Sequence, residues 1–234
     1  MSRRTWVSSL LMLLVVGSAV SAAAQGTIDQ CKSTVVANSG VLLACPKGDG
    51  DFLTNAIGGT NCQITLTVKD NANVGVAGIP ETDMWLVGCN NELLLCGLSS
   101  GSSADHPTNA QGQTTFSRAL ATGGCSAGVW VVVGGLVLHS PAACSTPLCV
   151  PIAVRSVDYK SVGSPCPGDM PCPDSQVTLS DWSWFTTHYP NAANPQAPYF
   201  ACADFAAPLG AIGLPELSRF TVHYATQAGH KCLR

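Results

Sequence analysis

Charged residues are scarce in this chain. Asp, Glu, Lys and Arg make up 11% of its 234 residues, far below the roughly 25% of an average soluble domain. Acidic residues outnumber basic ones by 14 to 11, which gives a formal net charge of −3. The chain therefore lacks the positive field that attracts nucleic acids and anionic lipid surfaces. We expect no nucleic-acid partner.

Long hydrophobic runs are missing everywhere except near the N-terminus. Arg3 and Arg4 precede an apolar run over residues 10–20, and three alanines follow at 22–24. A charged start, an apolar middle and small residues predict a secretory signal peptide over residues 1–24. The run is short for a membrane span, so a retained N-terminal anchor is the weaker alternative. We expect a secreted or extracellular protein, on a bacterial surface or in the periplasm, with no transmembrane segment after cleavage.

Cysteine, in contrast, is abundant. All 12 cysteines follow residue 24, and exported thiols oxidise, so we expect six disulfides. Sequence spacing favours local bridges, although spacing alone does not prove connectivity. The expected pairs are Cys31–Cys45, Cys62–Cys125, Cys89–Cys96, Cys144–Cys149, Cys166–Cys172 and Cys202–Cys232. A zinc site among the cysteines of residues 144–172 is the alternative, but their spacing is not that of zinc fingers.

Short strand-like runs separated by turns fill the middle of the chain. Residues 62–69, for example, place Ile64, Leu66 and Val68 at every second position. This alternation, repeated between Gly, Asn and Pro clusters, predicts an antiparallel β-sandwich over residues 26–157. The expected strands cover residues 62–69, 74–79, 84–87, 114–120, 129–133 and 150–157.

Three of these segments resemble a known family. Ile64–Asp70 (ITLTVKD), Val76–Pro80 (VAGIP) and Thr108–Ser117 (TNAQGQTTFS) are similar to the bacterial immunoglobulin-like repeats of surface and adhesin proteins. The resemblance implies an immunoglobulin-like sandwich that acts as a spacer or binding module. It brings no catalytic residues with it.

An eleven-residue motif occurs twice near the C-terminus. Leu179–Tyr189 aligns with Leu214–Tyr224 at a shift of 35 residues, with six identical positions. Large apolar residues recur at i, i+3 and i+7 in both copies, which is the pattern of one helical face. We expect residues 158–234 to form two short helices packed face to face, each preceded by a loop that bears Asp.

This C-terminal part resembles a second family. Val154–Asp158 (VRSVD) and Asp174–Trp182 (DSQVTLSDW) are similar to the duplicated calcium loop–helix of type I dockerins. The resemblance implies a calcium ion held by side-chain oxygens. The implied ligands are Asp158, Asp169, Asp174, Thr178 and Asp181 in the first loop, and Asp204 and Glu216 in a degenerate second loop. A disulfide-stapled helix pair that has lost the ion is the alternative.

Few residues suggest catalysis. Gly124–Gly128 matches G-x-S-x-G, but a strand-like run follows it where a nucleophile elbow needs a helix. His188 and His223 are expected to interact with the C-terminal ends of their helices. Trp184 and Arg219 lie off the apolar face, so we expect them to be exposed and to anchor a partner.

We therefore expect an exported, non-catalytic binding or cell-surface interaction protein. Its partner would be a protein or an extracellular polymer. Two alternatives remain: a structural subunit of an extracellular matrix or filament, and an accessory component of a secreted polysaccharide-degrading system.

Overall fold

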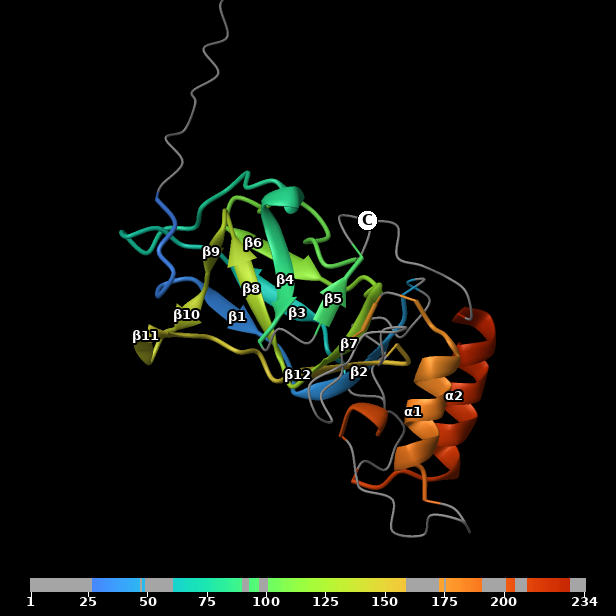
Figure 1. Cartoon of the computed structure of the whole chain (residues 1–234). Helices are drawn as coiled ribbons and strands as arrows, with labels where there is room; N and C mark the ends of the chain where they lie inside the picture. The colour runs from blue at the N-terminus through green and yellow to red at the C-terminus, as the bar shows by residue number, and fades with distance from the viewer. Residues whose placement is uncertain are drawn as a thin grey trace, which may run out of the picture.

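The structure is a computed structural model that describes residues 27–46, 48, 61–89, 93–96, 101–158, 173–174, 176–190, 201–204 and 210–227. The expected signal peptide, Asp169, Cys166, Cys172 and Cys232 lie outside these residues. The described part is mainly β, with several antiparallel sheets and two short helices (Figure 1).

Two antiparallel sheets of three strands enclose the larger core. One has the order β1 (Thr34–Val36), β3 (Ile64–Thr67), β6 (Gln113–Phe116); the other has the order β4 (Met84–Gly88), β8 (Val129–Val133), β9 (Leu136–Val137). Alternate residues point inward, so Leu66 of β3, Phe116 of β6 and Leu86 of β4 are fully or almost fully buried in one hydrophobic cluster. This is the core that the period-two pattern predicts.

A third sheet lies between this core and the helices. Its order is β2 (Gly40–Ala44), β12 (Ile152–Ser156), β7 (Thr122–Ser126), β5 (Leu93–Leu95). Leu42 and Val154 face the larger core, whereas Val41 and Leu43 pack into a second cluster with the helices. Burial on both faces explains the uninterrupted apolar sequence of β2. The pairing of β2 with β12 is parallel, so the expectation of a purely antiparallel body is wrong.

The two predicted helices are confirmed. α1 (Leu179–His188) and α2 (Leu214–Gln227) lie side by side and run antiparallel (Figure 1). Phe185 stacks on Phe220 with ring centroids 4.3 Å apart, and Trp182 contacts Tyr224 at 5.7 Å. The repeated aromatic face is therefore the contact between the helices.

Shorter elements complete the described structure. They are the 3-10 turns η1 (Glu81–Asp83) and η3 (Ala201–Ala203), and the hairpin strands β10 (His139–Ser140) and β11 (Ala143–Pro147).

The strands predicted at residues 62–69, 84–87, 129–133 and 150–157 are confirmed as β3, β4, β8 and β12, the first and last being shorter than predicted, but two others are not. Residues 74–79 form no strand beyond a single bridge between Gly75 and Lys69. Gly78 there has a φ of +76°, a conformation outside the strand region. The strand predicted at 114–120 stops at Phe116, and the Ser117 hydroxyl donates to Asp105 at 2.8 Å.

Three disulfides between described cysteines are long-range, which overturns five of the six predicted pairs; the sixth, Cys166–Cys172, lies outside the described residues. They are Cys31–Cys144, Cys89–Cys149 and Cys125–Cys202, with Cα–Cα distances of 5.3, 5.9 and 5.7 Å. Cys62 is buried in the larger core, and the Cys45 Sγ lies 3.5 Å from His223 Nδ1. The expectation that all 12 cysteines are paired stays a prediction.

Three disulfides suggest an oxidising, extracellular environment. Neither described helix has the length and apolar character needed to cross a membrane.

Candidate functional site

Four buried carboxylates mark the two loops that lead into the helices. Asp158, Asp181 and Asp204 are fully buried, and Glu216 is 2% exposed. Buried carboxylates are costly unless hydrogen bonds compensate them. The partners of these four side chains therefore show what the loops do.

The first loop holds its two acids against backbone amides. Asp158 lies two residues after the end of β12, and its Oδ1 accepts a hydrogen bond from the Asp174 N–H at 3.3 Å. Asp181 Oδ2 accepts from the Thr178 N–H at 2.6 Å and from the Thr178 hydroxyl at 3.1 Å. The Thr178 hydroxyl in turn accepts from the Ser180 N–H at 3.2 Å. Thr178 and Asp181 thus form a capping box that starts α1.

The second loop repeats this arrangement. Asp204 Oδ2 accepts a hydrogen bond from the Gly210 N–H, and Glu216 Oε2 accepts from the Gly213 N–H, both at 2.6 Å. Glu216 reaches back three residues, as Asp181 does in the first loop. The two helices therefore begin with an equivalent contact between an acidic side chain and a backbone amide three residues earlier.

Arg155 distinguishes the second loop electrostatically. Its guanidinium Nη1 lies 3.8 Å from Asp204 Oδ1, and the Arg155 side chain is only 12% exposed. An arginine on β12 thus supplies a positive charge beside the first acid of this loop. The sequence analysis missed this role, because Arg155 is distant in sequence from Asp204 and belongs to a strand.

The fit of these residues to calcium is incomplete. Among the described residues, the only three His, Cys, Asp or Glu side chains whose ligand atoms lie within 4.8 Å of one another are Cys31, His139 and Cys144. The described acids of the loops form no such group, whereas calcium takes six to eight oxygens. Calcium binding therefore stays a prediction.

Gly123 of β7 provides the space for Asp158. A Cβ atom on Gly123 would lie 1.9 Å from Asp158 Oδ2, far inside any allowed contact. The Gly124 N–H also donates to the Asp158 carbonyl at 2.8 Å. A glycine pair in a strand thus lets the first loop dock closely on the third sheet.

The two residues expected to anchor a partner lie in different environments. Trp184 is 8% exposed and contacts His188 in a tilted arrangement with ring centroids 4.3 Å apart, so the expectation that it is exposed is wrong. Arg219 is partly exposed.

The two repeated histidines also differ. His188 Nδ1 lies 3.0 Å from the Trp184 carbonyl oxygen, which confirms its expected interaction with the C-terminal turn of α1. His223 lies inside α2, which continues to Gln227, so the expected capping role is wrong there.

A separate cavity of about 520 Å³ lies at the edge of the body. Its described lining is mostly apolar and includes Ile28, Val76, Ile79 and Leu136, with Asp83 as the ionisable residue. A mostly apolar lining with few polar groups is typical of small-molecule pockets.

Comparison with known proteins adds no family assignment. No protein-family model matches the chain, and no curated protein matches it. Among solved structures it is similar to the filamin domain of Lin-41, with 13% identity and a TM-score of 0.27 over 53% of this chain and 95% of that one.

The calcium prediction has a direct test. If the first loop binds the ion, millimolar calcium raises the melting temperature of the wild-type chain, because a ligand bound only by the native state stabilises it. Asp181→Ala should abolish this rise, whereas Glu216→Ala in the second loop should retain it. Both variants lose a capping interaction worth about 1 kcal/mol, so they are matched in stability. A rise that persists in Asp181→Ala excludes the first loop as the site.

Proposed function

We propose that this chain is an exported, non-catalytic binding protein whose helix pair docks to a protein partner. In this proposal the body is an immunoglobulin-like sandwich, and the helix pair is a degenerate dockerin-like module. The observation that carries the proposal is the exposure of Leu179 and Leu214, at 71% and 73%. Each is the first residue of its helix, so in the antiparallel pair the two exposed leucines lie at opposite ends, and in this proposal the partner spans the length of the pair.

The attachment of the helices to the body supports this function. The Cys125–Cys202 disulfide joins β7 to η3, and the Arg155–Asp204 ion pair joins β12 to the loop before α2. The helices also share a buried cluster with Val41 and other residues of the third sheet. A fixed helix pair loses less conformational entropy on binding, and this favours affinity.

Capture of a partner from the native secreted fraction tests the proposal. The full chain serves as bait, with and without calcium, and retained proteins are identified by mass spectrometry. We expect Leu179→Ser with Leu214→Ser to weaken capture of the identified partner by about tenfold, equivalent to about 1.4 kcal/mol. The melting temperature should change little, because both side chains are exposed.

Val74→Ser is the matched control, since Val74 is another exposed apolar residue, 59% accessible, on the body. It should bind as the wild type does. Equal binding by the double leucine variant would show that the helix pair is not the docking surface. Concentration-dependent self-assembly in gel filtration, without any captured partner, would instead support a structural subunit.

A further inference from the structure

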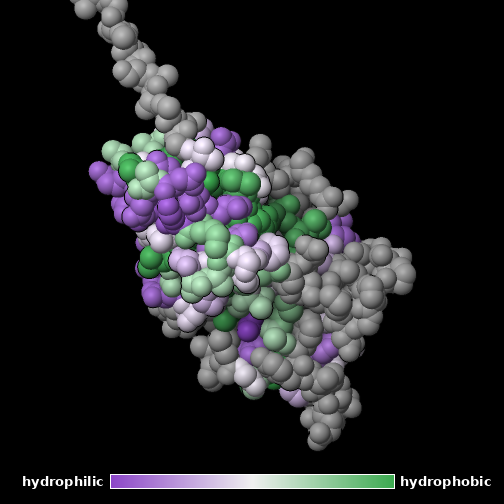
Figure 2. All heavy atoms as spheres, turned by 90° about the vertical axis from the view of Figure 1, so that its left-hand side faces the viewer, coloured by the Kyte–Doolittle hydropathy of each residue, from purple (hydrophilic) through white to green (hydrophobic). Residues whose placement is uncertain are grey.

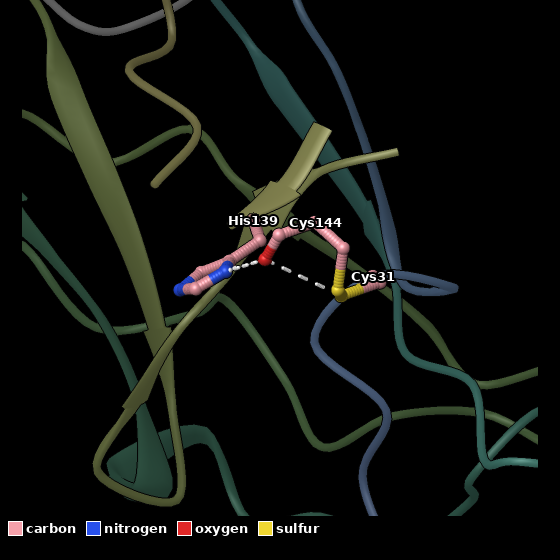
Figure 3. Close-up of side chains that lie close together, drawn as sticks. All are labelled: Cys31, His139 and Cys144. Atoms are coloured by element: carbon pink, nitrogen blue, oxygen red, sulfur yellow. Dashed lines mark hydrogen bonds between the residues drawn. A yellow bond between two sulfur atoms is a disulfide. The ribbon is translucent and has the colours of Figure 1, made fainter. Parts of the chain in front are cut away.

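Two sulfurs and an imidazole gather on the face of the body opposite the helices. Cys31 lies in the turn before β1, His139 in β10 and Cys144 in β11, and their ligand atoms all lie within 4.8 Å of one another. Figure 3 shows the imidazole and the sulfur atoms on either side of the Cys144 carbonyl oxygen, which His139 Nδ1 and Cys31 Sγ both approach. Cys144 is exposed, and Cys31 and His139 are partly exposed.

The surface around this group is open to solvent. Every residue of β11 is exposed. The face that carries β10 and β11 is a mosaic, with hydrophilic residues gathered toward one end and weakly polar to apolar residues elsewhere (Figure 2). A small reductant or a metal ion can therefore reach the Cys144 sulfur.

Backbone contacts hold the three residues together independently of the sulfur–sulfur bond. The His139 N–H donates to the Gln30 carbonyl at 3.1 Å, and the Gln30 side-chain amide donates to the Val137 carbonyl at 2.9 Å. Asp29 Oδ1 fixes the turn by accepting from the Cys31 N–H at 2.9 Å. The turn and the hairpin thus remain neighbours when the disulfide is opened.

We propose that reduction of the Cys31–Cys144 disulfide creates a zinc site from the two thiolates and the His139 imidazole. An external dithiol supplies the electrons: one of its thiolates attacks the Cys144 sulfur, and Cys31 leaves as a thiolate. The second thiol of the reagent then displaces Cys144 and closes a disulfide within the reagent. The two freed thiolates take up protons from water; zinc binding releases these protons again, and neutral imidazole is the third ligand.

The backbone geometry suits this change. Two thiolates on a tetrahedral zinc, each about 2.3 Å from the metal, lie about 3.7 Å apart. The Cα–Cα distance of 5.3 Å allows this separation by rotation of the cysteine side chains alone. His139 needs only a rotation about its side-chain bonds to turn a ring nitrogen toward the sulfurs. Three protein ligands leave the fourth position for water, as in open zinc sites.

The experiment uses the full chain, opened by limited treatment with a dithiol and freed of the reagent without oxygen. Differential alkylation and peptide mapping identify the open disulfide, which we expect to be Cys31–Cys144. Cobalt(II) then replaces zinc as a spectroscopic probe. We expect one equivalent to bind with thiolate-to-metal charge-transfer absorption, and added zinc to displace it. Zinc should also raise the melting temperature of the reduced chain.

His139→Ala retains both thiols and should bind cobalt at least about tenfold more weakly, a loss of about 1.4 kcal/mol. Cys31→Ser with Cys144→Ser should abolish the absorption, whereas Cys89→Ser with Cys149→Ser should retain it. Equal cobalt binding by His139→Ala and wild type would overturn the proposal, because it would show that the imidazole is not a ligand. Absence of cobalt absorption in the folded, reduced wild type would overturn it equally.

Discussion

Phe220→Ala should destabilise the helix pair by about 3–5 kcal/mol, the usual cost of removing a buried aromatic side chain. Phe220 has no exposed surface. Its ring stacks on Phe185 at 4.3 Å and contacts Trp182 at 5.5 Å and Tyr224 at 5.8 Å. One truncation therefore removes the residue at the centre of the contact between the two helices. The expected result is a cavity that the neighbouring rings cannot fill.

Urea unfolding followed by near-ultraviolet circular dichroism measures this loss. Leu214→Ala in the same helix is the matched control, because Leu214 is 73% exposed and its truncation should cost less than about 0.5 kcal/mol. Equal unfolding midpoints for Phe220→Ala and the control would show that the aromatic contact does not hold the helices.

Asp204→Leu should cost about 3–5 kcal/mol, because it removes one member of a buried ion pair and leaves the other. The Asp204 side chain is fully buried, and its carboxylate lies 3.8 Å from the Arg155 guanidinium. The same substitution removes the acceptor of the Gly210 N–H. Both losses weaken the contact between β12 and the segment that leads to α2.

The double variant Arg155→Met with Asp204→Leu separates charge burial from general damage. It should be more stable than Asp204→Leu alone, since no unbalanced buried charge remains. Lys32→Met, which breaks the exposed pair with Asp29, should cost at most about 1 kcal/mol. Thermal unfolding of all three variants supplies the comparison. A double variant as unstable as the single one would refute the electrostatic explanation.

The elements with strong periodicity were predictable from sequence. β3, β8 and β12 have alternating or continuous apolar residues, and the repeated aromatic residues of α1 and α2 indicate helices that pack together. β7 could not be predicted, because its sequence TGGCS contains no large side chain. Glycine is needed at position 123 because Asp158 occupies the place of a side chain.

Trp184 shows why the exposure of single residues was harder to predict. The buried residues of α1 are Asp181, Trp184, Phe185 and His188, which lie on one helical face at i, i+3, i+4 and i+7. Because two of these four residues are an acid and a histidine, the pattern of apolar residues alone does not identify this face as the buried one. Their burial depends on the capping box and on the contact of His188 with Trp184, which only the folded chain reveals.

The disulfide partners were unpredictable for a topological reason. The three described bridges join residues 113, 60 and 77 positions apart, whereas most of the pairs predicted from spacing join nearby cysteines. Cys31 meets Cys144 because the turn before β1 lies beside the β10–β11 hairpin. This pairing depends on how the sheets are arranged in the folded chain, so the spacing of cysteines in the sequence does not predict it.

The parallel pair of β2 and β12 also affects the order in which the chain can fold during synthesis. β2 is made early, but its hydrogen-bonding partner β12 follows only after most of the body. Until then β2 has no polar face to turn toward water, since both of its faces are apolar. A nascent chain therefore exposes an apolar, aggregation-prone segment until β12 has been synthesised. Completion of the third sheet, rather than of the first two, is thus the step that protects the chain.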